Sequence, residues 1–210
     1  MVVRYEGAPA ATTSGATHSS FTGNGTIGEA GVTYQVYRYL TPGTGYTFDL
    51  TGVNMAERLQ AEIASDISGS GDFRYAGPAG TVILSGNNTY TGSTTIDAGT
   101  LVVNGSLSGT SEVTVKSGAI LSGNGSIGGD VTFESGSTLL TSGTLNIAGT
   151  VTIESGVTLD FTSSSSLLLT YDAIDGEFDP ELNIPQGWQV EYGANELRLI
   201  PPGATVFRFR

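Results

Sequence analysis

The chain has 210 residues, of which 31 are glycine, 38% are hydrophobic and only 13% are charged, and it contains no cysteine. Its formal net charge of -12 argues against nucleic acid and against an anionic membrane surface as partners. No apolar stretch approaches the length of a membrane span, so we expect no membrane insertion by this chain.

Residues 1–65 are predicted to form an irregular, aromatic-rich region that caps a repeat structure. Tyr34, Tyr37 and Tyr39 lie close together in this region. One interpretation is a carbohydrate platform on which these rings stack against sugars. The other is that bulky side chains cover the open end of a stack of repeats, which terminal units commonly must do.

A single short helix is predicted near the end of this region, at about residues 55–64. Asn54 and Glu57 have the spacing of a helix capping box. The apolar residues that follow them repeat every four positions and would share one helix face, namely Met55, Leu59 and Ile63.

A repeat of about nineteen residues dominates the predicted central region, residues 66–160. The pattern Val-Thr-x-x-Ser-Gly occurs at 113–118, 131–136 and 151–156, with a degenerate copy at 94–99. The final glycines of the four copies are separated by 19, 18 and 20 residues. Such a period indicates a solenoid, in which each unit buries its apolar face by stacking on its neighbours.

Each repeat is predicted to contain short strands and tight turns and no helix. Alternation of apolar and polar residues indicates strands, and Ser-Gly and Asn-Gly supply turns, with Asn-Gly tolerating positive φ. The fold class is therefore all-β, a right-handed parallel β-helix with about nineteen residues per rung. The residues expected to point inward are Val113, Val115, Val131, Phe133, Val151 and Ile153.

The segment from Leu84 to Gly105 resembles the passenger-associated repeat of bacterial autotransporters. Its core reads Asn-Thr-Tyr-Thr-Gly at 88–92, and Ile-Ser-Gly-Ser-Gly-Asp-Phe at 67–73 resembles the stretch that leads into that repeat. The resemblance covers about residues 66–160. It implies a surface-exposed or secreted β-helix exported by the type V route or a related one, and it identifies a stalk, not an activity.

Residues 161–200 are predicted to form the C-terminal rungs and a cap, because aromatic residues return there. Four acids cluster at 172–179, where they could attract calcium or form a polar turn. An EF-hand is excluded because Asn183 stands where the loop would require its final glutamate. We favour a polar turn and expect no metal site.

Both ends of the chain have strand-like sequences that could join one subunit to another. Residues 201–210 are predicted to be a linker and a terminal strand, because Pro201 and Pro202 separate the last rung from 204–210. Such strands can add to a neighbour's open sheet edge and build fibres; the alternative is that both are frayed ends. The possible self-assembly residues are Val2, Val3, Tyr5, Val206, Phe207 and Phe209.

Catalytic chemistry is poorly represented in the sequence. His18 is the only histidine, and no cluster of histidine and cysteine could hold zinc. Lys116, Glu134 and Glu154 occupy one repeat position beside Asp97, which predicts an exposed ladder of charges on successive rungs. We therefore expect no catalytic residues, no cofactor and no bound metal.

These features predict a non-catalytic bacterial cell-surface or secreted passenger or stalk module with an adhesive or structural role. The alternative is a self-assembling extracellular filament subunit joined through its terminal strands. A polysaccharide-degrading β-helix enzyme is a more distant alternative. The expected partners are further copies of the chain, or glycans and proteins of a host surface, and not nucleic acid.

Overall fold

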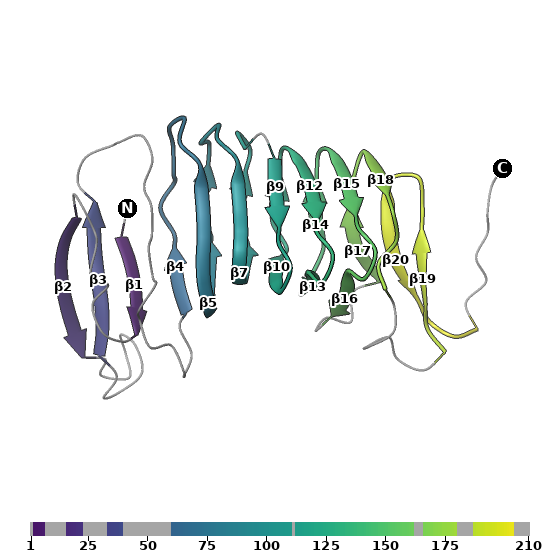
Figure 1. Cartoon of the computed structure of the whole chain (residues 1–210), viewed down its shortest axis with the longest axis horizontal. Helices are drawn as coiled ribbons and strands as arrows, with labels where there is room; N and C mark the ends of the chain where they lie inside the picture. Colours follow the sequence, from purple (N-terminus) through teal and green to yellow (C-terminus); the bar gives the residue numbers. More distant parts are fainter. Residues whose placement is uncertain are drawn as a thin grey trace.

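The computed structural model describes residues 2–6, 16–22, 33–39, 60–110, 112–161, 166–179 and 187–203. These residues form strands and turns, and none of them is in a helix. Figure 1 shows the strands arrayed side by side along one long axis, with the sequence running from one end of the array to the other. The architecture is a parallel β-solenoid, which confirms the predicted fold class.

A separate antiparallel sheet precedes the solenoid. It contains β1 (Val2–Glu6), β2 (Ala16–Thr22) and β3 (Thr33–Tyr39), in the order β1-β3-β2. Val2 pairs with Arg38 and Glu6 pairs with Tyr34, so the whole of β1 is matched to β3. In Figure 1 this sheet lies beside β4, at the start of the solenoid.

The first face of the solenoid is built from the strands that begin each repeat. These are the first parts of β5 (Phe73–Leu84) and β7 (Thr94–Val103), followed by β9 (Glu112–Val115), β12 (Asp130–Phe133), β15 (Thr150–Ile153) and β18 (Ala173–Asp175). All pair in parallel, and the Val-Thr copies are in exact register, with Val113 beside Val131 and Val131 beside Val151.

Two further faces complete each rung. The second face contains β4 (Gln60–Ile63), the later parts of β5 and β7, β10 (Ala119–Gly123), β13 (Thr138–Thr141) and β16 (Thr158–Phe161). The third face contains β6 (Asn87–Asn88), β8 (Ser106–Leu107), β11 (Ser126–Ile127), β14 (Leu145–Ile147) and β17 (Leu167–Thr170).

Alternation along each strand sends one set of side chains into the solenoid, where like residues stack on like. All six predicted inward residues are buried, and Phe133 is 0% exposed. Their outward neighbours Thr114, Thr132 and Thr152 are only partly covered. The inward assignment from the repeat pattern is therefore confirmed.

Glycine serves two different purposes at the corners. Gly136, in the Ser-Gly turn after β12, has a φ of 80°, a left-handed conformation that favours glycine. Gly125, in the Asn-Gly turn after β10, does not have positive φ, so that part of the turn prediction was wrong. A Cβ at Gly125 would lie 2.1 Å from the carbonyl oxygen of Gly105 in the preceding rung, so close stacking of the corners requires glycine there.

The predicted helix at about 55–64 is wrong over its final residues. Residues 60–63 form β4, which pairs in parallel with β5 so that Ile63 stands beside Leu84. Ile63 is 2% exposed. The edge of the first rung offers a row of backbone partners and an apolar core, which outweigh a local capping signal. Residues 55–59 lie outside the described part of the chain.

The C-terminal end of the solenoid is closed by a hairpin and by aromatic side chains. β20 (Glu196–Ile200) pairs antiparallel with β17, and β19 (Gln189–Tyr192) pairs antiparallel with β20. The Phe178 ring meets the Phe133 ring edge to face, with centroids 5.6 Å apart. Trp188 also packs against the core from this end. At this end, aromatic side chains therefore contact the core.

Candidate functional site

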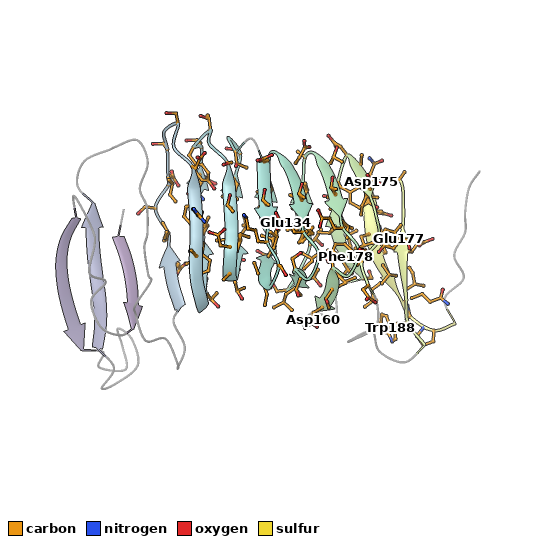
Figure 2. All side chains as sticks on the ribbon, in the orientation of Figure 1. Glu134, Asp160, Asp175, Glu177, Phe178 and Trp188 are labelled. Carbon is orange, nitrogen blue, oxygen red and sulfur yellow. The ribbon has the colours of Figure 1, made fainter. Side chains whose placement is uncertain are left out.

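The repeat carries a column of charged residues along the outer surface of the first face. Lys116, Glu134 and Glu154 each follow the strand of their rung, and their amides continue the parallel ladder by donating to Ile96, Val115 and Phe133 respectively. Figure 2 shows Glu134 near the middle of the solenoid. The exposed ladder expected from the repeat spacing is thus present.

Asp97 is the most engaged member of this column. Its carboxylate forms an ion pair with Arg74, and the Nζ of Lys116 lies 3.8 Å from its Oδ1. The side chains of Arg74 and Lys116 are 66% and 43% exposed, against 17% for Asp97. Hydrogen bonding to Asp97 raises the pKa of the Arg74 guanidinium. Two cations therefore flank one carboxylate.

The role of Arg74 was missed by the sequence reasoning. The sequence feature that could have revealed Arg74 is the alignment of Phe-Arg-Tyr at 73–75 with Thr-Thr-Ile at 94–96. The structure pairs these two segments residue by residue. The alignment places Arg74 beside Thr95, one rung before Asp97 and two rungs before Lys116, on the same outward face.

An open groove of about 490 Å³ runs over this part of the surface. Its lining mixes carboxylates, cations and hydroxyls and contains no aromatic side chain; the lining residues are Asp72, Arg74, Ser93, Thr95, Asp97, Thr114, Lys116 and Glu134. Asp72 Oδ1 accepts hydrogen bonds from the amide of Ser93 at 2.9 Å and from its hydroxyl at 3.1 Å. The groove offers groups that could hydrogen-bond to a polar ligand.

The arrangement does not resemble a glycosidase pair. Such a pair needs one carboxyl group poised as an acid and a second free to act as base or nucleophile. Asp97 is held between two cations, and Glu154 Oε2 accepts a hydrogen bond of 2.9 Å from the amide of Ser135. Both carboxylates therefore already have charged or hydrogen-bonding partners on the surface of the solenoid.

A buried polar network lies inside the corner between β6 and β7. Asn88 is 0% exposed, and its Oδ1 accepts a hydrogen bond from the amide of Ile67 at 3.0 Å. Its Nδ2 donates to the carbonyl oxygens of Gly86 at 3.0 Å and Ser106 at 3.1 Å. One side chain therefore joins three successive rungs.

A second set of buried hydrogen bonds joins hydroxyl groups at the start of β7. The Tyr90 hydroxyl lies 2.6 Å from that of Thr94, which lies 3.2 Å from the Thr110 hydroxyl. Thr110 also donates to the carbonyl oxygen of Gly92 at 2.9 Å. Burial raises the pKa of Tyr90 to about 12. Asn88 and Tyr90 of the Asn-Thr-Tyr-Thr-Gly core are thus interior residues, a role the sequence reasoning did not assign to them.

The acidic segment 172–179 follows the last rung. Gly176 has a φ of 91°, and the amide of Asp179 donates to the carbonyl oxygen of Val157 at 2.7 Å. The acids Asp172, Asp175, Glu177 and Asp179 are exposed. Among the described residues, no group of three or more potential ligands is placed to hold a metal ion.

The terminal residues proposed for self-assembly fall in different parts of the structure. Val2, Val3 and Tyr5 belong to β1, which is already paired with β3 on one side. Tyr34, Tyr37 and Tyr39 belong to β3, and His18 to β2, where it pairs with Tyr37. The other three predicted assembly residues, Val206, Phe207 and Phe209, lie outside the described residues.

Comparison with known proteins identifies the central segment. Residues 79–103 match the family model of the passenger-associated-transport-repeat, which confirms the resemblance noted for 84–105. The match contains Asn88, Tyr90 and Thr94 of the buried network. The chain therefore carries a passenger-associated-transport-repeat within a β-solenoid, a combination consistent with an autotransporter passenger. No curated protein matches the chain.

No helix in the described part of the chain is long and apolar enough to cross a membrane.

Proposed function

We propose that this chain is a non-catalytic β-solenoid module of a bacterial autotransporter passenger, displayed at the cell surface or secreted, with an adhesive or structural role. The observation that carries the proposal is the position of the repeat's characteristic residues. Asn88, Tyr90 and Thr94 lie inside the solenoid. Asn88 bonds to the rungs on both sides, and Thr94, which the Tyr90 hydroxyl contacts, bonds to Thr110 of the next rung. Residues within the matched repeat therefore stabilise a stack of rungs, which suits a stalk.

The absence of reactive groups from the repeat supports a non-catalytic role. The carboxylates of Asp97 and Glu154 are occupied by cations and by a backbone amide. Glu134 lies one rung from Lys116 on an open, polar surface. An acid catalyst would need an environment that keeps its carboxyl group protonated near neutral pH. This surface supplies ionic and hydrogen-bonding partners instead.

An adhesive role would use this groove. Its carboxylates accept hydrogen bonds, its cations donate them, and its hydroxyls do both. A neutral glycan presents hydroxyl groups with the same dual capacity, so a host glycan is a suitable class of ligand. The net charge of -12 disfavours a strongly anionic polymer.

Localisation can be tested with an antibody raised against the folded chain. The protein should be detected on intact bacteria or in the culture medium, and an extracellular protease should remove the cell-bound signal. A periplasmic marker in the same cells serves as the control for leakage. Detection only after the cells are lysed would contradict the proposal.

Catalysis can be tested separately with neutral and acidic polysaccharides. We expect no cleavage by the wild-type chain, and no change in melting temperature when EDTA is added. Cleavage that disappears in Glu134→Gln or Glu154→Gln would show that the carboxylate ladder is an active site. A large fall in melting temperature with EDTA would show that the fold depends on a metal.

A further inference from the structure

The outward side of the solenoid's second face carries no charge over four successive rungs. Each strand of this face has two outward positions, and parallel pairing aligns them into two columns along the long axis (Figure 1). From β5 to β13, the residues at the first and second positions are, in order, Thr81 and Ile83, Thr100 and Val102, Ile120 and Ser122, and Thr138 and Leu140. Charge returns at the two ends of the second column, at Glu62 on β4 and Asp160 on β16.

The aliphatic members of these columns remain partly exposed. Alternation along each strand buries their neighbours, such as Leu101 and Leu139, which are 0% and 1% exposed. The outward aliphatic residues are only partly covered, namely Ile83, Val102, Ile120 and Leu140. The second face therefore presents an apolar surface interspersed with hydroxyl groups.

The first face shows that a strand of this solenoid does not require such an outward surface. Around Thr114 and Thr132, its outward positions carry charged residues, including Glu112, Lys116 and Asp130. The whole chain has 20 acidic residues and a net charge of -12, yet its second face excludes charge over four rungs. Depletion of charge together with exposed aliphatic side chains is typical of the centre of a protein interface.

We propose that this face packs against the same face of a second copy of the chain, with the two solenoids parallel and related by a two-fold axis along their length. Each rung then meets the same rung of the partner. Rotation about this axis places the first outward position of a strand opposite the second outward position of the partner's strand. In three of the four rungs a threonine thereby faces an aliphatic side chain, as Thr100 faces the partner's Val102.

The remaining rungs fit this arrangement by size and by hydrogen bonding. Ile120 takes the first position on β10, where the other strands have threonine, and the second position on the same strand is Ser122. The larger residue therefore faces the smaller one across the interface. On β16, the hydroxyl of Thr158 faces the partner's Asp160 and can donate a hydrogen bond to its carboxylate. The two columns are thus complementary to each other, which favours a second copy of this chain as the partner.

The opposite orientation fits the same residues less well. A two-fold axis running across the solenoid at β10 would bring Ile120 against the partner's Ile120 and Ser122 against the partner's Ser122, giving crowding beside a gap. It would also set Ile83 against the partner's Asp160, burying a carboxylate on an aliphatic surface. Contact through the first face would bring carboxylates of both copies together in chains that already repel by charge. The parallel pair through the second face is therefore favoured.

The size of the face sets the strength of the pair. Five strands about 4.8 Å apart, each with about four residues rising about 3.3 Å, cover about 300 Å² on each copy. This is well below the roughly 800 Å² per partner of a standard stable interface. We therefore expect a weak dimer, with a dissociation constant on the order of 100 µM. The inference does not depend on an adhesive role for the groove, and a monomeric chain would leave the proposed stalk role unaffected.

Cross-linking can test the register directly, because the chain contains no cysteine. Thr100→Cys protein is mixed with size-tagged Val102→Cys protein and a short thiol-reactive cross-linker, since stacked sheets lie about 10 Å apart, too far for a disulfide. We expect a mixed product of about twice the chain mass of 21.6 kDa. Thr150→Cys with Thr152→Cys is the matched control, because these residues are outward and equally spaced on β15 of the first face. This control should give at least about tenfold less product.

Sedimentation equilibrium tests the strength of the pair and the residues in contact. The average mass of the wild-type chain should rise between roughly 10 µM and 1 mM. Val102→Glu and Leu140→Glu each bury a carboxylate in the pair and should weaken it at least about tenfold. Thr152→Glu, on the outward side of the first face, is the control and should leave the dimer unchanged. Melting temperatures at low concentration check that all three variants keep the solenoid intact.

Four results would overturn the inference. A wild-type chain whose mass stays at that of one copy up to about 1 mM forms no such pair. A dimer unaffected by both glutamate substitutions on the second face would use another surface. Equal cross-linking of the Thr150→Cys and Thr152→Cys proteins would indicate random collision. Cross-linking of Thr100→Cys to Thr138→Cys in preference to Val102→Cys would show an antiparallel pair, since that orientation sets β7 against the partner's β13.

Discussion

The rung that carries the passenger repeat and the rungs after it fill the same interior columns with different chemistry. Asn88 stands in register with Leu107, Ile127 and Ile147. Thr94 likewise stands in register with Val113, followed by Val131 and Val151. The later rungs are held by apolar stacking, whereas the passenger repeat at 79–103 has side-chain hydrogen bonds at two of these positions.

The difference follows from what lies on the N-terminal side of each rung. The regular rungs rest on strands whose backbone groups are already paired. The rung before β6 is irregular at Ile67, whose amide has the Asn88 side chain as its partner. A buried polar residue is therefore favourable where the neighbouring backbone leaves a donor to satisfy, and an apolar residue is favourable elsewhere.

The largest expected effect is in the apolar rungs. Phe133→Asp places a carboxylate at a position that is 0% exposed and lies between Val115 and Ile153 in an apolar column. We expect a loss of at least about 4 kcal/mol in the free energy of unfolding, measured by denaturant melts. Thr132→Asp, on the outward side of the same strand, is the control and should cost far less. An unchanged midpoint in Phe133→Asp would refute the inward assignment.

Asn88→Leu makes the first rung resemble the later ones and tests the comparison directly. If stacking alone mattered, leucine would stabilise the column. We expect the free energy of unfolding to fall by about 3 kcal/mol, because the amide of Ile67 and two carbonyl oxygens lose their hydrogen-bond partner. Ile127→Leu, in the same column, provides the control for a change of apolar shape. A more stable Asn88→Leu protein would refute the assigned role.

High pH should weaken the polar rung selectively. Burial raises the pKa of Tyr90 to about 12, above the ordinary 10, so its contribution is complete below pH 10 and is lost as pH rises to about 12. The resulting decrease in the free energy of unfolding should approach about 2 kcal/mol. Burial also raises the pKa of Tyr75 to about 12, so Tyr90→Phe should remove only part of the pH dependence. An identical profile in Tyr90→Phe would contradict this.

Thr94→Val should lower the free energy of unfolding by about 1.5 kcal/mol, although valine occupies this position in the later rungs. The reason is that the substitution leaves the Tyr90 hydroxyl buried without its partner. The double variant with Tyr90→Phe should be more stable than the sum of the single losses predicts, because both partners are then apolar. Strict additivity in the double-mutant cycle would show that the two hydroxyls do not interact.

The smallest effect is expected on the outer surface. Arg74→Ala removes the ion pair with Asp97, but the arginine side chain is 66% exposed. We expect no measurable change in melting temperature at physiological salt and a slight decrease at low salt. A large decrease that persists in high salt would mean that the charged column stabilises the solenoid more than its exposure suggests.

The repeat sequence alone determined the architecture and the inward faces of 113–153. A strand alternates with a period of two, and in-register copies stack like residues, so both properties follow from local pattern and period. The same reasoning placed Lys116, Glu134 and Glu154 in one column, because a position in the repeat is a position on the surface.

Only the tertiary structure decided features that depend on a neighbouring rung. Residues 60–63 form a strand because the edge of β5 is available to them. Arg74 reaches Asp97 across 23 positions of sequence, and Asn88 reaches Ile67 across 21. In a solenoid the partner of each residue lies about one rung away. Local sequence therefore determines whether a side chain points inward or outward, while the neighbouring rung determines which residues it contacts.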